Sequence, residues 1–419
     1  MDLESFEAPE VSGIAGTALS TNFSYDVAKS LVARHGKAIH IDWDSYANPE
    51  RLGPVLARLL PVAGEDWAVE PHPDWKRWFD SARINLAWLL DRVAPDVYDL
   101  LDLPLRWELG DSAATRSRIR IPRRQIFYHR EPLLKRREVS LQAEFSAPRI
   151  SVTRVPPKRV QKLLDLILDT SAVRYRELYG FTYPDRNHVY HADFGRGVDV
   201  FFFGIPDQWR LPLRAYHAGM FFKNGVPIGY VEGLSLFEHM EVGFNLYYTF
   251  RDGETAWLYA RLLKLFREQL GVTCFSVDPY QLGHDNEEAI ESGAFWFYRK
   301  LGFKPASDKI AHLVVLEEEK ISARPGYRTP PATLRRLASA PLFYCPTEDG
   351  GGQEWARFDI RQVGYRVGLH GKRPWTSDPE IVRAKHGPEE SRYLRLLQKN
   401  PRLRRAILRL GSQQSFAES

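Results

Sequence analysis

Apolar residues recur at helical spacing through most of the first 150 residues of the chain. Ser24 or Asp26 can cap the first of these segments, because both side chains accept hydrogen bonds from free amide groups at a helix start. The predicted helices cover residues 27–34, 49–60, 74–90 and 94–101. We therefore expect a mostly helical N-terminal domain over about residues 15–150, for which the sequence indicates no particular chemistry.

The pattern changes after Pro156-Pro157. A helix is predicted over residues 160–178, because its apolar positions keep helical spacing. Asn224-Gly225 then separates two apolar runs, and this pair tolerates the positive φ angles of a tight turn, so the two runs are expected to form a β-hairpin. The predicted strands cover residues 198–205, 213–222, 228–236 and 242–250.

Helical and strand patterns alternate in the region that follows. A helix is predicted to continue to residue 270, followed by a strand over 273–277, a helix over 287–301 and a closing strand over 311–316. This order predicts the α+β fold class, with a core over about residues 155–320. A C-terminal extension over 321–419 carries a basic helical pattern at 388–410.

Composition and net charge indicate which broad class of protein this chain belongs to. Of the 419 residues, 44% are hydrophobic and 13% are aromatic, which is typical of a folded chain with two or three domains. The 58 Lys and Arg against 53 Asp and Glu give a net charge of only +5. Charge alone therefore does not indicate a nucleic-acid-binding protein.

The two cysteines and the N-terminus bear on location. Cys274 and Cys345 are too few for a disulfide framework or a Cys-rich zinc site, and we interpret them as reduced thiols in a reducing compartment. The N-terminus is acidic, without the apolar stretch of a secretory signal, and no run approaches the roughly 18 apolar residues of a membrane span. The sequence thus predicts a cytoplasmic protein with no membrane partner.

A helix ending in Phe-Tyr-Arg-Lys-Leu-Gly-Phe, residues 297–303, is the most informative segment. With the preceding loop-helix unit and the Asn-Gly hairpin, it resembles the GNAT superfamily of acyl-CoA N-acyltransferases over about residues 155–316. The resemblance implies a mixed, mainly antiparallel sheet flanked by helices. It also implies acetyl-CoA or another acyl-CoA as donor, and direct attack in a ternary complex by the amine of a small molecule or peptide.

The loop at 251–256 connects a predicted strand to a predicted helix, and free backbone amides at a helix start favour an anion. In the family this loop holds the acyl-CoA pyrophosphate. Arg251 and Ala256 fit the outer positions of the family pattern, but Glu254 stands where a glycine is expected, and Gly253 comes one residue early. By resemblance the cofactor-binding residues are Asn245, Tyr247, Arg251, Asp252, Gly253, Glu254, Thr255, Ala256 and Asn286. The alternative is an ordinary strand-to-helix turn.

Tyr298 matches the tyrosine that the family often uses as a general acid toward the departing thiolate. A phenol, with an ordinary pKa of about 10, can protonate a thiolate whose thiol has a pKa of about 8.5. Tyr298 can equally be a core aromatic, since its neighbours are also aromatic.

Glu232 and Glu241 are the candidate bases that would take a proton from the acceptor amine. Both lie in or beside apolar strands, where burial raises the pKa of a carboxyl. Either can instead be a solvated charge at a strand end. His217 is a third option, or a structural histidine in a strand.

Other patterns point to functions that we consider less favoured. His188 and His191 lack a third metal ligand in a recognised spacing, so no metal site is predicted. The basic tracts 115–137 and 392–409 suggest nucleic acid, but acidic residues accompany them and solvated basic faces are the simpler interpretation. Two alternative functions remain: an aminoacyl-tRNA-dependent transferase, which would need a second GNAT-like sheet in residues 15–150, and a non-enzymatic acyl-CoA-binding or regulatory protein.

Overall fold

The computed structural model divides the chain into two compact units. Unit 1 comprises residues 1–121 and 161–182, and unit 2 comprises residues 122–160 and 183–419. The residues that the structure describes are 8, 11–69, 73–79, 84–123, 125–211, 213–251, 253–346, 355, 360, 361, 399–402, 404 and 405. Most of the basic C-terminal pattern at 388–410 lies outside this set.

Unit 1 is mainly helical and also contains a small antiparallel sheet in the order β1-β3-β2. The strands were not expected, because each has four residues or fewer and so shows no clear alternation. The helices and strands are α1 (Tyr25–His35), α2 (Leu52–Leu59), α3 (Pro61–Val69), α4 (Lys76–Phe79), α5 (Leu86–Arg92), α6 (Pro95–Leu101), β1 (Ala18–Thr21), β2 (Ile39–Ile41) and β3 (Leu105–Glu108). Among the described residues of 15–150, this three-stranded sheet is the only sheet, so a second large sheet is absent there. The helix predicted to start at residue 160 is α8 (Pro157–Ala172), and α9 (Tyr179–Thr182) follows it.

Unit 2 is built on a nine-stranded mixed sheet in the order β11-β12-β10-β9-β8-β7-β6-β5-β4. Every neighbouring pair is antiparallel except β9 and β10, which are parallel. The strands are β4 (Ser151–Arg154), β5 (Val189–Gly195), β6 (Val198–Phe203), β7 (Ala215–Lys223), β8 (Val226–Leu236), β9 (His239–Leu246), β10 (Cys274–Val277), β11 (Lys304–Pro305) and β12 (Leu342–Tyr344). The α+β class with a large mixed sheet flanked by helices is thus confirmed.

The central strands form where the sequence is continuously apolar. All six residues of β6 are buried, as expected for a strand covered on both faces. The hairpin of β7 and β8 turns at Asn224 and Gly225, whose φ angles are 50° and 84°. The predicted Asn-Gly turn is therefore confirmed. The register shifts between Phe221 and Phe222, and beyond this irregularity Glu232 lies opposite Ala218.

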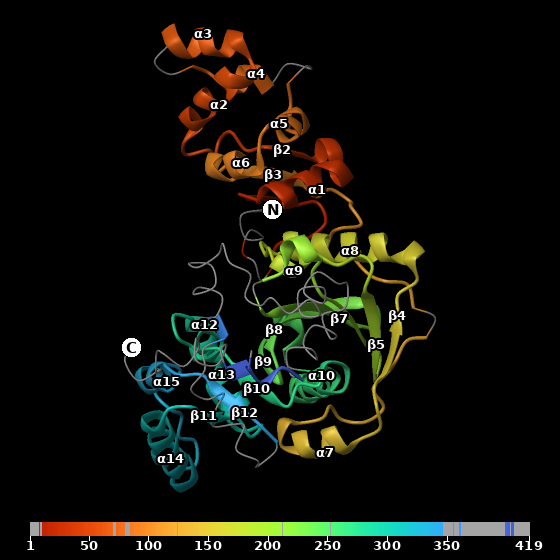
Figure 1. Cartoon of the computed structure of the whole chain (residues 1–419), viewed down its shortest axis with the longest axis vertical. Helices are drawn as coiled ribbons and strands as arrows, with labels where there is room; N and C mark the ends of the chain where they lie inside the picture. The colour runs from red at the N-terminus through yellow and green to blue at the C-terminus, as the bar shows by residue number, and fades with distance from the viewer. Residues whose placement is uncertain are drawn as a thin grey trace. The chain divides into compact units, whose positions relative to one another are not determined.

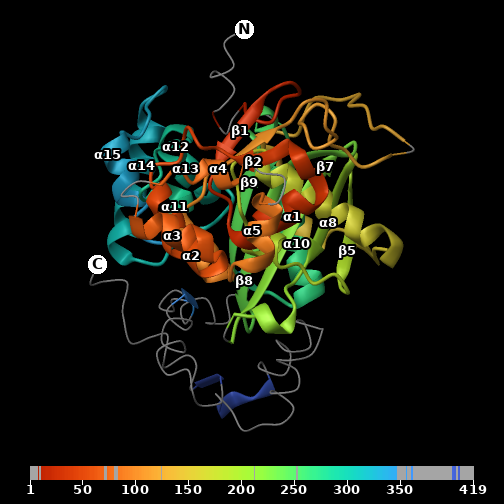
Figure 2. The ribbon, with the colours of Figure 1, turned by 90° about the horizontal axis from the view of Figure 1, so that it is seen from above.

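Helix α10 (Thr255–Leu270) packs on this sheet and supplies a large part of the core of unit 2. Both views draw it beside β8 and β9 (Figures 1 and 2). It ends at Gly271 with φ of 73°, the left-handed cap that glycine favours. The helix predicted over 287–301 is instead two short helices, α12 (Glu287–Ser292) and α13 (Ala294–Arg299), since Gly293 between them also adopts a positive φ.

The predicted closing strand over 311–316 is wrong. These residues lie in helix α14 (Asp308–Ala323), which buries Ile310, Val314 and Glu317 at helical spacing. The strand that pairs with β10 on this side is β12, which comes after helix α15 (Pro331–Leu337), and β11 forms the edge of the sheet beyond it. The strand predicted over 242–250 begins earlier and ends at Leu246, so that residues 248–250 form a short 3-10 turn.

Cys274 and Cys345 form a disulfide, so the prediction of two reduced thiols is also wrong. They are brought together because β10 and β12 are antiparallel neighbours in a register that places the two residues opposite each other. The sequence could not show this pairing, since 71 residues separate them. Across the described part of the chain, no helix combines the length and the apolar character needed to cross a membrane.

Candidate functional site

The site begins where the parallel strands β9 and β10 separate. They pair at only three positions, the last being Glu241 with Ser276. Strand β10 ends at Val277 and turns into helix α11 (Pro279–Leu282), while β9 continues to Leu246 in regular pairing with β8. From Val242 onwards, one edge of β9 therefore has no neighbouring strand among the described residues.

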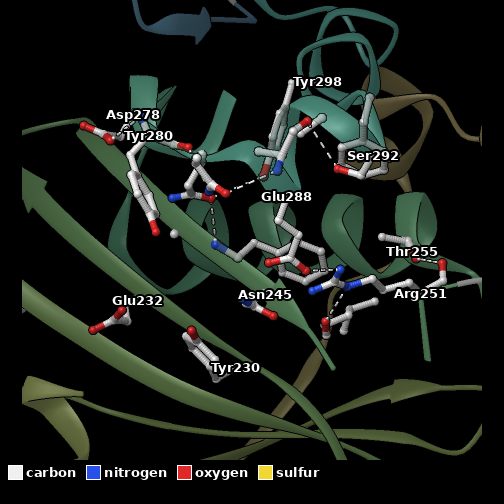
Figure 3. Close-up of a pocket in the computed structure, with 18 of the residues that line it drawn as sticks. Tyr230, Glu232, Asn245, Arg251, Thr255, Asp278, Tyr280, Glu288, Ser292 and Tyr298 are labelled. Atoms are coloured by element: carbon white, nitrogen blue, oxygen red, sulfur yellow. Dashed lines mark hydrogen bonds and ion pairs between the residues drawn. The ribbon is translucent and has the colours of Figure 1, made fainter. Parts of the chain in front are cut away.

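A pocket of about 480 Å³ lies at this edge. Figure 3 shows side chains entering it from the sheet, from the start of α10 and from α11–α13. The lining residues predicted from the sequence are Glu232, Asn245, Arg251, Thr255, Asn286 and Tyr298. Other residues that line the pocket include Tyr230, Gly243, Phe244, Asp278, Tyr280, Gln281, Glu288, Ser292, Phe297 and Arg361.

Tyr298 lies on α13 and is only 4% exposed, yet its side chain lines the pocket. Burial raises the pKa of its phenol above the ordinary value, so the hydroxyl keeps its proton at neutral pH. The hydroxyl donates to Gln281 Oε1 at 3.3 Å, and the ring packs against Tyr259. Tyr298 is thus both a core aromatic and a protonated group at the pocket wall.

Glu232 projects from β8 into the same pocket (Figure 3). Burial raises the pKa of its carboxyl, and a hydrogen bond donated by Tyr216 partly offsets this effect. Arg361, a cation that also lines the pocket, lowers the pKa of this carboxyl more weakly. Glu232 is therefore a carboxyl whose protonation changes at a higher pH than that of an ordinary glutamate.

Glu241 does not line the pocket. Its Oε1 accepts from Arg361 Nε at 3.0 Å and Nη2 at 2.9 Å, and the same Nη2 lies 3.1 Å from Asp278 Oδ2. Of the three residues, Arg361 and Asp278 line the pocket. Since 120 residues separate Arg361 from Glu241, the sequence carried no signal for this pairing.

The loop before α10 contributes Arg251 and Thr255 to the pocket. Arg251 Nε donates to Leu246 O at 3.0 Å, and its guanidinium also pairs with Glu288. Thr255 Oγ1 donates to Arg251 O at 2.9 Å, which ties the first turn of the helix to the loop. The fixed cation predicted here is present, and its charge is shared with a carboxylate.

Other residues predicted to hold the cofactor lie away from the pocket. Glu254 accepts from Arg196 Nε at 2.9 Å and from the amide of Leu134 at 3.1 Å, and these contacts lower the pKa of its carboxyl despite burial. Ala256 is buried in the core. Tyr247 and Gly253 do not line the pocket, and Asp252 lies outside the described residues.

Asn286 lines the pocket but also acts as the cap of α12. Its side chain accepts from Ala289 N at 3.2 Å and donates to Tyr280 O at 3.1 Å. The segment 279–283 supplies Tyr280 and Gln281 to the wall. Asn286 holds this segment against α12.

The remaining titratable candidates have other partners. His217 is buried, which lowers its pKa to about 3, and its Nε2 lies 3.0 Å from Ser235 Oγ. His188 and His191 pair with different carboxylates, Asp185 and Asp199, at 2.8 Å each. Among the described residues, no group of three or more potential ligands can hold a metal ion. In the basic tract at 115–137, the described residues form turns and irregular backbone, with a 3-10 helix beginning at Arg136.

No family model, curated protein or solved structure matches this chain.

Proposed function

We propose that unit 2 transfers an acyl group from acyl-CoA to an amine at the pocket beside β9. The observation that carries this proposal is the presence, around one pocket, of a buried phenol at Tyr298, a carboxyl of raised pKa at Glu232 and a cation at Arg251. The resemblance of residues 297–303 to the GNAT superfamily agrees with this chemistry. So does the separation of two parallel strands at the pocket.

The reaction follows from the roles of these groups. The amine nitrogen attacks the thioester carbonyl carbon, a C–N bond forms and the C–S bond breaks. Glu232, directly or through water, takes the proton that the amine loses, and Tyr298 gives its proton to the departing thiolate. Burial keeps the Tyr298 phenol protonated at neutral pH and also makes it a weaker acid, so its proton has to move to sulfur as the C–S bond breaks.

We expect kcat/KM to rise with pH as the Glu232 carboxyl loses its proton. We call this rise the Glu232 limb of the pH profile. The carboxyl must be ionised to accept a proton, and its raised pKa places the midpoint above that of an ordinary glutamate. In Glu232→Gln this limb should disappear and kcat should fall by roughly 100-fold. The measurement is kcat/KM for an amine acceptor between pH 5 and 9.

Tyr216→Phe provides the matched control for this assignment. Tyr216 donates to Glu232 and so lowers the pKa of the carboxyl, and its loss should move the limb to higher pH without abolishing it. A limb that stays in place in both variants would contradict the role of Glu232.

Arg251 and Glu288 pair with each other, and we expect their replacement to change the affinity for acyl-CoA in opposite directions. Arg251→Ala should weaken the binding of an acyl-CoA about tenfold, because a charge-assisted hydrogen bond to phosphate is lost. Glu288→Gln should strengthen it, since this carboxylate now competes for the Arg251 guanidinium. Calorimetric titration with acetyl-CoA and longer acyl-CoAs measures both changes.

The titration also separates the proposed enzyme from its alternatives. Saturable binding together with transfer supports the proposal. Saturable binding without any product would favour a non-enzymatic acyl-CoA-binding protein. No binding of any acyl-CoA would remove the proposed donor and contradict the function.

A further inference from the structure

The side-chain amide of Gln281 completes the hydrogen bonding of β9 where the neighbouring strand has left it. Its Nε2 donates to Val242 O at 3.2 Å, and its Oε1 accepts from Phe244 N at 3.1 Å. These two bonds are of the kind that a backbone amide of β10 would make if the parallel pairing continued. Gln281 therefore ties helix α11 to the open edge of β9 at the pocket wall.

These bonds also fix which end of the Gln281 amide faces which group. A flipped amide would place its NH₂ against the amide of Phe244 and its oxygen against the carbonyl of Val242, so both hydrogen bonds would be lost. The fixed oxygen is the acceptor for the Tyr298 hydroxyl at 3.3 Å. Because that oxygen can only accept, the proton of the phenol has to point toward the edge of β9.

Gly243 gives an independent indication that this position of the amide is built into the fold. It lies between Val242 and Phe244 on β9, and a Cβ at this position would lie 3.2 Å from Gln281 Nε2. A glycine in the middle of a strand weakens the strand, and close approach of another group is a usual reason for it. The strand is thus shaped to admit the Gln281 amide.

We propose that Gln281 is a positioning residue for Tyr298 and aims its proton at the place where the thiolate departs. This inference rests on the proposed acyl transfer. Before the reaction, the Tyr298 hydroxyl donates its hydrogen bond to Gln281 Oε1. A thiolate formed beside β9 then replaces this oxygen as the acceptor. When the C–S bond breaks, the proton moves from the phenol to sulfur, and the phenolate then regains a proton from solvent.

A double-mutant cycle tests the inference. Gln281→Met is expected to lower kcat about tenfold with less than a twofold change in KM. The Tyr298 phenol remains, but no side-chain oxygen at position 281 then orients its proton toward β9. Tyr298→Phe should lower kcat by roughly 100-fold, and the variant carrying both changes should be no slower than Tyr298→Phe alone. If the two losses multiply in the double variant, Gln281 acts independently of Tyr298 and the inference is overturned.

Three further variants separate positioning from a general structural effect. Gln281→Glu keeps an oxygen acceptor and should recover part of the kcat that Gln281→Met loses. Gly243→Ala should lower kcat in the wild-type background and leave Gln281→Met unchanged, since its methyl group acts by displacing the amide. Gln142→Met changes an exposed glutamine of unit 2 and should have no effect. Equal activity of Gln281→Glu and Gln281→Met would overturn the inference.

Failure of the proposed function gives a different result from failure of this inference. A wild-type protein that transfers no acyl group from any acyl-CoA contradicts the function, and the inference falls with it. If the wild-type protein is active and the losses of kcat in Gln281→Met and Tyr298→Phe multiply in the double variant, only the role of Gln281 is contradicted.

Discussion

Replacing Tyr298 with phenylalanine is expected to lower the kcat of acyl transfer by roughly 100-fold, with little change in the KM of donor or acceptor. The substitution removes one hydroxyl from a ring that is 4% exposed, so packing of the ring should persist. The loss falls on kcat because the proton is transferred only as the C–S bond breaks. Steady-state kinetics with acetyl-CoA measure the effect. The readout is the free thiol that the reaction releases.

Tyr259→Phe is the matched control for this experiment. Tyr259 is fully buried, its ring centroid lies 5.4 Å from that of Tyr298, and its hydroxyl has no hydrogen-bond partner among the described residues. It does not line the pocket. Its replacement should therefore leave kcat unchanged. Similar losses of kcat in both variants would assign the effect to packing and would contradict the role of Tyr298 as an acid.

Replacing Lys264 with methionine is expected to destabilise unit 2 by about 3 kcal/mol. Lys264 is a buried cation on α10, and its Nζ donates to Glu144 O at 2.8 Å and to Ala147 O at 2.6 Å. It also pairs with Glu268 at 3.3 Å. Methionine fills the space but leaves the carbonyl groups of Glu144 and Ala147 without the Lys264 donor and removes the cation that pairs with Glu268. The midpoint of urea unfolding and the hydrogen exchange of α10 peptides measure the change.

Lys309→Met is the control for the stability experiment. Lys309 is exposed on α14, and an exposed substitution of this kind usually changes the free energy of unfolding by less than about 0.5 kcal/mol. If both lysine variants unfold at the same urea concentration, the buried contacts of Lys264 do not stabilise unit 2 as argued.

The position of the pocket could be predicted in part, because several of its residues belong to one continuous segment. Asn245, Arg251 and Thr255 lie close together in the sequence, and the strand-loop-helix pattern placed them at one end of the sheet. Glu232 could be included because it lies within an apolar strand, where burial raises the pKa of a carboxyl. The roles of Glu254 and Ala256 were not predictable from spacing, since their direction depends on the first turn of α10 and on Arg196.

Local sequence determined those features of this protein whose physical cause is local. Continuous apolar runs specified the central strands, Asn224-Gly225 specified the hairpin, and Gly271 specified the end of α10. These depend on backbone preferences and on burial within a few residues. The α+β class of unit 2 followed from the order of such elements.

Tertiary structure decided the features that require residues distant in the chain to meet. The place of β12 beside β10, the disulfide between Cys274 and Cys345, and the reach of Arg361 to Glu241 each join segments more than 60 residues apart. The strand predicted at 311–316 was wrong for a local reason, because Ile310, Val314 and Glu317 recur at helical spacing in a longer segment. Contacts between distant segments form only when the fold brings those segments together. A local sequence pattern therefore does not predict them.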